Sequence, residues 1–182
     1  LDIFVVDEDA HLPLGRPWIT VAIDKRTRMV LGFHISFSPP SVEAVMHCLR
    51  HAVLPKIDLK ARYPALKNSW LAHGLPETLV VDNGLEFHAE ALEVAALGLG
   101  FRIEFGGKRK PFHKGAIERF LKTLNYNLIH KLPGTSFAKY WQRFDFDPLK
   151  TALITLEKLN EVIHRWILDV YSQKMHRGIS AP

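Results

Sequence analysis

A strand, a helix and a second strand follow one another in the middle of the chain, and this order limits the folds that the chain can adopt. The apolar, β-branched run 78–81 stops at an Asp-Asn-Gly turn that begins with Asp82, which is typical of a buried strand that ends at its carboxyl terminus. Asn83 and Glu86 have the spacing of a helix-capping box and predict a helix after the turn. Residues 101–105 are apolar again and predict another strand. Strands that alternate with helices indicate an α/β fold.

Similar patterns predict the other elements. Apolar runs predict strands at 3–6, 18–23 and 29–35, and a polar turn joins the last two as a hairpin. Segment 7–17 contains two prolines and a glycine and predicts a loop. Helical spacing of apolar residues predicts further helices at 42–53, with Ser41 as its N-cap, at 114–130, and after Pro148.

The size of the chain predicts one domain. It has 182 residues, 47% of them apolar, which suffices for one core but not for two ordinary domains. No run approaches the roughly 20 apolar residues of a membrane span, and the start of the chain lacks the basic region of a signal peptide. The single cysteine, Cys48, cannot form an internal disulfide. We therefore expect a soluble, cytoplasmic protein with no membrane partner.

Asp82 and Glu118 are the candidate catalytic and metal-binding residues. A carboxylate at the end of a strand and a carboxylate on a helix can converge on one cleft although 35 residues separate them. Hard divalent ions such as Mg²⁺ or Mn²⁺ prefer carboxylate oxygens. Two such ions, about 3.5 to 4 Å apart, stabilise both the attacking and the leaving oxygen in a displacement at phosphorus. Two ions require a third carboxylate, so we expect the pair to be incomplete.

Positive charge is concentrated around Glu118. Between Arg102 and Lys122 lie seven basic and two acidic residues, and this excess equals the net charge of +5 of the whole chain. A basic segment around a candidate metal site favours a polyanionic substrate bound through its phosphates. The candidate DNA-binding residues are Lys108, Arg109, Lys110, Lys114, Arg119, Lys122 and Asn125. The alternative is an ordinary solvated helix face on which Glu118 pairs with Lys122.

These motifs resemble the catalytic core of the retroviral integrase superfamily of D,D,E transposases. The resemblance depends on Asp82-Asn83-Gly84 with Glu86-Phe87, and on Lys114-Gly115 followed by Glu118-Arg119-Phe120. Within that superfamily the chain is similar to the bacterial Mu-type transposase branch. The residues that carry this second similarity are Pro13 to Trp18, Asp24, Thr27, Arg28, Gly32, Tyr171, His176, Gly178 and Pro182.

The resemblance implies an RNase H-like fold, with a five-stranded mixed sheet flanked by helices. Residues 1–182 would form one integrase-type catalytic domain, with a core of about 1–130 and a C-terminal helical extension of about 131–182. The implied reaction is metal-dependent cleavage of DNA 3′ ends followed by strand transfer, with two Mg²⁺ or Mn²⁺ ions in the complete site. The implied partners are transposon ends, target DNA and further copies of the protein, in the nucleoid of a bacterium.

The chain departs from the family pattern at the first catalytic aspartate. In the family this residue lies on the first strand in an Asp-x-Thr triplet, and residues 1–182 contain no such triplet. We expect it a few residues before Leu1, with Asp2 as a weaker alternative and Asp7 as a weaker one still. Asp24 resembles the non-catalytic aspartate of the second strand. Without the first aspartate, residues 1–182 would be inactive alone.

Two other functions remain open. The chain could be a catalytically inactive RNase H-like domain that binds DNA or assembles a complex, or a structure-specific nuclease of the same fold. His47, Cys48 and His51 fit an amphipathic helix better than a metal site, since no further ligand accompanies them. No module that reads bases is visible, so the sequence does not identify the DNA ends.

Overall fold

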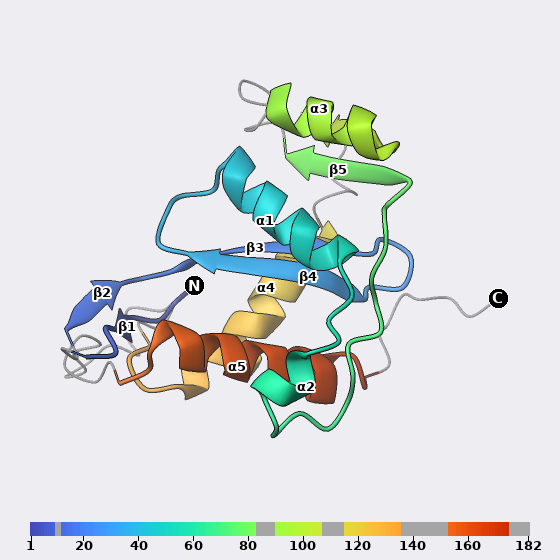
Figure 1. The fold of residues 1–182 in the computed structure, drawn as a ribbon. Coiled ribbons are helices and arrows are strands. Elements are labelled where there is room, and N and C mark those ends of the chain that lie inside the picture. The colour runs from blue at the N-terminus through green and yellow to red at the C-terminus, as the bar shows by residue number, and fades with distance from the viewer. Residues whose placement is uncertain (10–11, 83–89, 107–114, 136–152, 175–182) are drawn as a thin grey trace.

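The computed structural model describes residues 1–9, 12–82, 90–106, 115–135 and 153–174 as a mixed α/β structure (Figure 1). Its strands are β1 (Val5–Val6), β2 (Pro13–Gly15), β3 (Trp18–Ile23), β4 (Val30–Ser36), β5 (Thr78–Asp82) and β6 (Arg102–Gly106). Its α-helices are α1 (Val42–Val53), α2 (Leu59–Arg62), α3 (Glu90–Leu99), α4 (Gly115–Asn127) and α5 (Leu156–Trp166). A short 3₁₀ helix, η3 (Ile129–Lys131), follows α4, and a π-helix, η5 (Ile167–Tyr171), continues α5.

Most predicted elements are present, with shifts at their ends. The helix at 42–53 is confirmed, and the Ser41 side chain accepts a hydrogen bond of 3.2 Å from the amide of Ala44, as an N-cap does. The prediction of a loop at 7–17 is wrong, because β2 lies inside it and pairs with β1. The first strand is shorter than predicted, and only an isolated bridge to Thr135 includes Ile3.

The described strands form three two-stranded sheets rather than one. The pairs are β1 with β2, β3 with β4, and β5 with β6, and the first two pairs are antiparallel. The third pair is parallel, and α3 lies in the connection between its strands. The five-stranded sheet that the resemblance implies is thus not present among the described residues.

Helix α1 lies directly against the hairpin of β3 and β4 (Figure 1). The approach is closest at Gly32, where an added Cβ would lie 2.6 Å from the backbone nitrogen of Ala52 and 2.9 Å from its Cα. Glycine is therefore required at this position, because any side chain would overlap the backbone of the helix. The C-terminal half of α1 is also linked to β5, β6 and α3, by a smaller cluster around Leu49, Ala96 and Phe101.

The opposite side of the hairpin faces the main core. Phe33 and Ile35 of β4 share this core with Phe120 and Leu124 of α4 and with several residues of α5 and η5. Phe120 and Leu124 are 1% and 0% exposed. Residues 156–171, which lie in the predicted helical extension, therefore pack into the same core as the hairpin.

Polar contacts fix the C-terminal helix to the segment after α2. One carboxylate oxygen of Asp169 accepts a hydrogen bond of 3.1 Å from the Lys67 amide. The other accepts two bonds of 2.9 Å, from the amide and the side chain of Asn68. Asp169 lies in the π-helical turn, whose wider spacing alters the direction of its side chains relative to α5.

Candidate functional site

Asp82 is the last residue of β5, as the sequence predicts. Its partner in the parallel register is Gly106, the last residue of β6. The basic segment that leads to Glu118 therefore leaves the sheet beside Asp82. The strand is not buried on both faces, since Val81 is 8% exposed and Val80 is 40% exposed. The side chain of Asp82 lies outside the described part of the structure.

Glu118 lies in the first turn of α4, on the face opposite the core. Its carboxylate is exposed and forms no hydrogen bond or ion pair with any described residue. The alternative of a Glu118–Lys122 pair is thus not realised in the structure. An exposed carboxylate with free oxygens has the donor chemistry that Mg²⁺ and Mn²⁺ prefer.

Three predicted DNA-binding residues share α4 with Glu118. Arg119 and Lys122 are exposed on the same outer side of the helix. Asn125 is half-buried, and its Oδ1 accepts a hydrogen bond of 3.4 Å from the amide of Asp2, so part of its hydrogen-bonding capacity serves the fold. The other four candidates, Lys108, Arg109, Lys110 and Lys114, lie outside the described residues.

Two further aspartates that the sequence singled out are engaged in structural contacts. One oxygen of Asp2 accepts a hydrogen bond of 2.5 Å from Arg16, and the other lies 3.2 Å from Nε2 of His130. A carboxylate held between two such groups has little capacity left for a metal, so these contacts disfavour Asp2 as a ligand. The carboxylate of Asp24 accepts bonds from the amide and hydroxyl of Thr27, which fits a non-catalytic role.

The histidines of α1 do not form a metal site with one another. His47 stacks on His34 of β4, with ring centroids 4.7 Å apart. His51 instead contacts the backbone of Phe33, and burial raises the pKa of the adjacent Cys48 thiol to about 12. Among the residues that the structure describes, no three His, Cys, Asp or Glu side chains are placed to hold a metal ion. Helix α1 is amphipathic, with Cys48 and Leu49 buried and His47 and Arg50 exposed.

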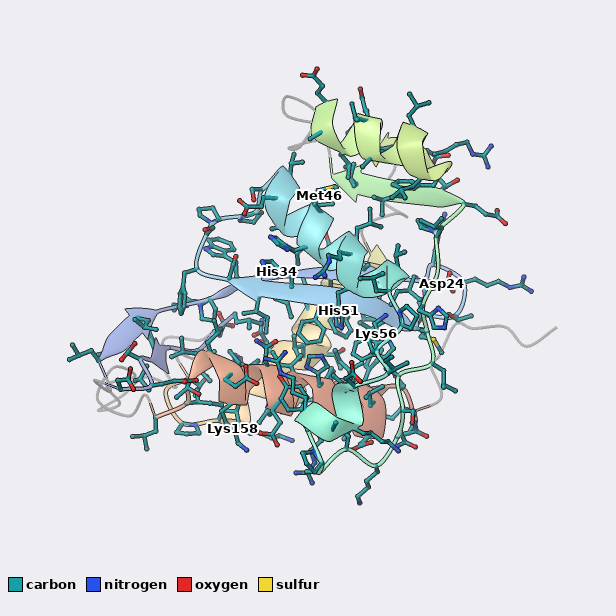
Figure 2. The ribbon with its side chains drawn as sticks, viewed as in Figure 1. Asp24, His34, Met46, His51, Lys56 and Lys158 are labelled. Carbon is teal, nitrogen blue, oxygen red and sulfur yellow. The ribbon has the colours of Figure 1, made fainter. Side chains whose placement is uncertain are left out.

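His51 and Lys56 cover the outer edge of β4, a role that the sequence did not reveal (Figure 2). Nδ1 of His51 lies within hydrogen-bonding distance of both backbone polar groups of Phe33. The ammonium group of Lys56 donates to the carbonyls of Leu31, Ala52 and Ala72 at 3.1, 3.3 and 2.8 Å. Burial lowers the pKa of Lys56 to about 8. These contacts block further strand pairing at this edge.

The turn between β3 and β4 carries a second group of basic residues, which the sequence did not indicate as a binding surface. Lys25 and Arg26 are exposed and Arg28 is half-buried. The carbonyl of Arg28 accepts a hydrogen bond of 3.3 Å from the Tyr171 hydroxyl, which links the turn to η5. Three basic residues within four positions were the available signal.

The described residues form a mixed α/β structure in which an exposed carboxylate, that of Glu118, lies on a helix within a basic segment. Comparison with known proteins assigns the chain to a family. Residues 1–134 match the model of the TnsB C-terminal domain, and the chain belongs to that family. This is a transposase family, as the names of two relatives indicate. No described helix has the length and apolar character needed to cross a membrane.

Both relatives are longer than this chain. The chain is 28% identical over 181 residues to the transposase for transposon Tn552 of Staphylococcus aureus. The aligned region covers 100% of this chain and 34% of that protein. It is 31% identical over 171 residues to the transposon Tn7 transposition protein TnsB of Escherichia coli. This aligned region covers 92% of this chain and 24% of that protein. The chain therefore spans about a third and about a quarter of these relatives.

Proposed function

We propose that this chain is the catalytic domain of a DNA transposase, which cuts DNA at the 3′ ends of a transposon and joins those ends to target DNA. The observation that carries the proposal is the exposed carboxylate of Glu118, which has no partner among the described residues and follows a basic segment that begins beside Asp82. The segment thus leads from one candidate metal ligand to the other. The names of the two relatives agree with this function.

The proposed chemistry has two steps at phosphorus. In the first step a water oxygen attacks the phosphorus, the bond to the 3′ oxygen breaks, and the strand ends in a free 3′ hydroxyl. In the second step that hydroxyl attacks a phosphorus of the target, the bond from this phosphorus to the target's own 3′ oxygen breaks, and the target strand is left with a 3′ hydroxyl. One phosphorus–oxygen bond thus replaces another, so no energy source is consumed. Two Mg²⁺ or Mn²⁺ ions would activate each nucleophile and stabilise the charge that develops on the phosphate.

Asp82 and Glu118 would hold the ions together with a third carboxylate. Glu118 fits this role because its oxygens have no partner among the described residues, unlike those of Asp2 and Asp24. The third acid would be the aspartate of an Asp-x-Thr triplet, which residues 1–182 do not contain. The basic side chains around Glu118 would hold the DNA by its phosphates, with little reading of bases. Because a transposase acts on two transposon ends at once, we expect the protein to work as a homo-multimer. Its DNA substrate would place it in the bacterial nucleoid.

An RNase H-like fold is part of the same proposal. Helix α1 contacts the β3–β4 hairpin and also packs, through Leu49, on Ala96 and Phe101 near β5 and β6. One helix therefore spans both strand pairs, as it would if they were two parts of a single mixed sheet. The edge of β3 away from β4 and the edge of β5 away from β6 pair with no described strand. A further strand between these edges would complete a five-stranded sheet.

The decisive experiment uses Asp82→Asn and Glu118→Gln in the full-length protein. Both variants remove one ionisable carboxylate while nearly preserving shape. We expect strand transfer to be lost in each, because ion binding requires the charged oxygens, while DNA binding measured on the same preparations changes little. Glu93→Gln is the matched control, since Glu93 is exposed on α3 and has the same chemistry. Wild-type joining rates in either active-site variant would refute the proposal.

The two other functions give different results in the same assay. A catalytically inactive domain predicts no cleavage or joining by the wild-type protein with Mg²⁺ or Mn²⁺. A nuclease predicts cleaved DNA but no joined product when donor ends with a free 3′ hydroxyl are supplied. The transposase proposal predicts joined product, its loss on addition of a chelator, and its return with either ion.

A further inference from the structure

Three basic residues lie in the turn of the β3–β4 hairpin, far along the chain from the segment around Glu118. They are Lys25, Arg26 and Arg28, and a fourth cation, Lys174, follows η5, whose Tyr171 contacts the turn. The hydrogen bond from Tyr171 to the carbonyl of Arg28 holds the two segments together. These four residues are called the turn patch. None of them forms an ion pair with another described residue, and the one carboxylate of the turn, that of Asp24, interacts electrostatically with Arg26.

The backbone of the turn is fixed before any partner binds. One oxygen of Asp24 lies 2.6 Å from the amide of Thr27 and 2.5 Å from its hydroxyl, and the amide of Arg28 donates to the carbonyl of Asp24 at 2.9 Å. Burial alone would raise the pKa of Asp24, but the hydrogen bonds from Thr27 outweigh it and hold the pKa below its ordinary value. The carboxylate thus serves the turn, and the cations around it are presented on a rigid support.

Arg28 occupies a backbone conformation that favours glycine. Its φ of 64° is the only positive φ of a non-glycine residue in the described part of the chain. Glycine adopts this conformation without steric cost, whereas arginine does not. Residues held in such conformations concentrate at functional sites. The presence of a cation here, rather than glycine, is explained if the charge itself has a role.

We propose that the turn patch binds the sugar-phosphate backbone of duplex DNA, as a contact separate from the segment around Glu118. This rests on the proposed function, which supplies DNA as the partner. In Figure 1 the β5 arrow, which ends at Asp82, points in the same direction as the β4 arrow and away from the β3–β4 turn. Figure 2 shows Asp24 at this far end of the hairpin. The turn patch and Asp82 therefore lie toward opposite ends of the domain.

The two places would contact different parts of one duplex. Because the turn patch lies toward the other end of the domain from Asp82, it would hold DNA that flanks the reacting phosphate.

The test measures the salt dependence of binding to a mixed-sequence DNA duplex in the full-length protein. The variant combines Lys25→Ala, Arg26→Ala and Lys174→Ala. Arg28→Gly is a second variant, because it removes the charge and relieves the positive φ. Each lost phosphate contact should reduce the slope of log affinity against log salt by about 0.9, measured between about 50 and about 200 mM. We expect a reduction of roughly 2 to 3 in the slope for the triple variant and about 1 for Arg28→Gly.

Two controls match the charge change. Arg50→Ala, Lys67→Ala and Lys131→Ala together remove three exposed cations from other surfaces and should leave the slope nearly unchanged. Lys25→Arg with Arg26→Lys keeps the charge of the turn and should bind as the wild type does. Urea denaturation confirms that each variant is folded. An unchanged slope in the triple variant and in Arg28→Gly would refute DNA binding by the turn patch while leaving the proposed function intact. Failure of the wild type to bind DNA would overturn both.

Discussion

The Nδ1 atom of His51 lies 2.9 Å from the carbonyl oxygen of Phe33 and 3.0 Å from its amide nitrogen. This ring nitrogen on α1 accepts a hydrogen bond from the amide of a β4 residue in one tautomer and donates one to its carbonyl in the other. Phe33 is buried, so neither group has free access to water. The contact holds helix α1 against strand β4. His51 is therefore a structural residue.

His51→Ala should lower the free energy of unfolding by about 1 to 3 kcal/mol, because it leaves a buried backbone group without a partner. Urea denaturation followed by circular dichroism measures the change. Arg50→Ala is the control on the same helix, since Arg50 is exposed, and its effect should stay within about 0.5 kcal/mol. Equal midpoints for the two variants would contradict the role assigned to His51.

Stability should fall as the pH is lowered from about 6.5 to about 4. Burial lowers the pKa of His164 from 6.5 to about 4, and burial with the charge of Lys56 also lowers that of His51. Between these pH values the unfolded chain binds protons that the folded chain excludes, so each such histidine costs up to about 1.4 kcal/mol per pH unit. Above pH 6.5 this contribution to stability is complete.

His164→Phe keeps a ring among Phe33, Tyr63 and Trp70 but cannot be protonated. Its unfolding free energy should therefore depend less on pH across the same window than that of the wild type. Urea midpoints measured at several pH values for both proteins give the comparison. Parallel curves would show that His164 does not titrate as its burial requires.

Gly32→Ala and Gly98→Ala should have opposite effects. An alanine at position 32 would place its Cβ 2.6 Å from the nitrogen of Ala52, so α1 would have to move, at a cost of about 1 to 3 kcal/mol. At position 98, in α3, no atom lies within 4 Å of the new methyl group. Alanine there should stabilise the helix by about 0.5 to 1 kcal/mol. Thermal unfolding of both variants tests the pair, and a stabilising Gly32→Ala would be incompatible with the close contact.

Asp169→Ala should destabilise the protein by about 1 to 3 kcal/mol, because the amides of Lys67 and Asn68 lose their acceptor. Asp58→Ala is a suitable control, since the Asp58 side chain makes no capping hydrogen bond to α2. Urea denaturation at neutral pH distinguishes the two. A loss in Asp58→Ala as large as that in Asp169→Ala would show that removal of any acid from this region is sufficient.

The sequence predicted elements that depend on local patterns and missed features that depend on contacts between distant segments. Helix α1 was predicted to the residue because Ser41 and the apolar spacing are local signals. Strand β2 was missed because Pro-Leu-Gly has little strand propensity and is extended only through its pairing with β1. The grouping of strands into pairs likewise depends on tertiary contacts.

The candidate site was predictable only in part for the same reason. The position of Asp82 at the end of β5 and that of Glu118 on α4 follow from the turn and helix patterns around them. Only the folded arrangement shows that Glu118 has no partner within the described part of the chain, whereas Asp2 is held by Arg16 and His130. The positive φ of Arg28 also could not be predicted from the sequence, because nothing in the neighbouring residues indicates that conformation.

The contact between Gly32 and Ala52 also has a mechanical consequence. Because backbone lies against backbone there, no layer of side chains remains that could rearrange and let α1 slide along β4. The helix and the hairpin must therefore move as one rigid body. The contact of α1 with the β5–β6 side is made instead by a few side chains around Leu49 and Phe101, which can change rotamer. Any hinge between the two parts of the domain would lie at that contact, and it would carry Asp82 with it.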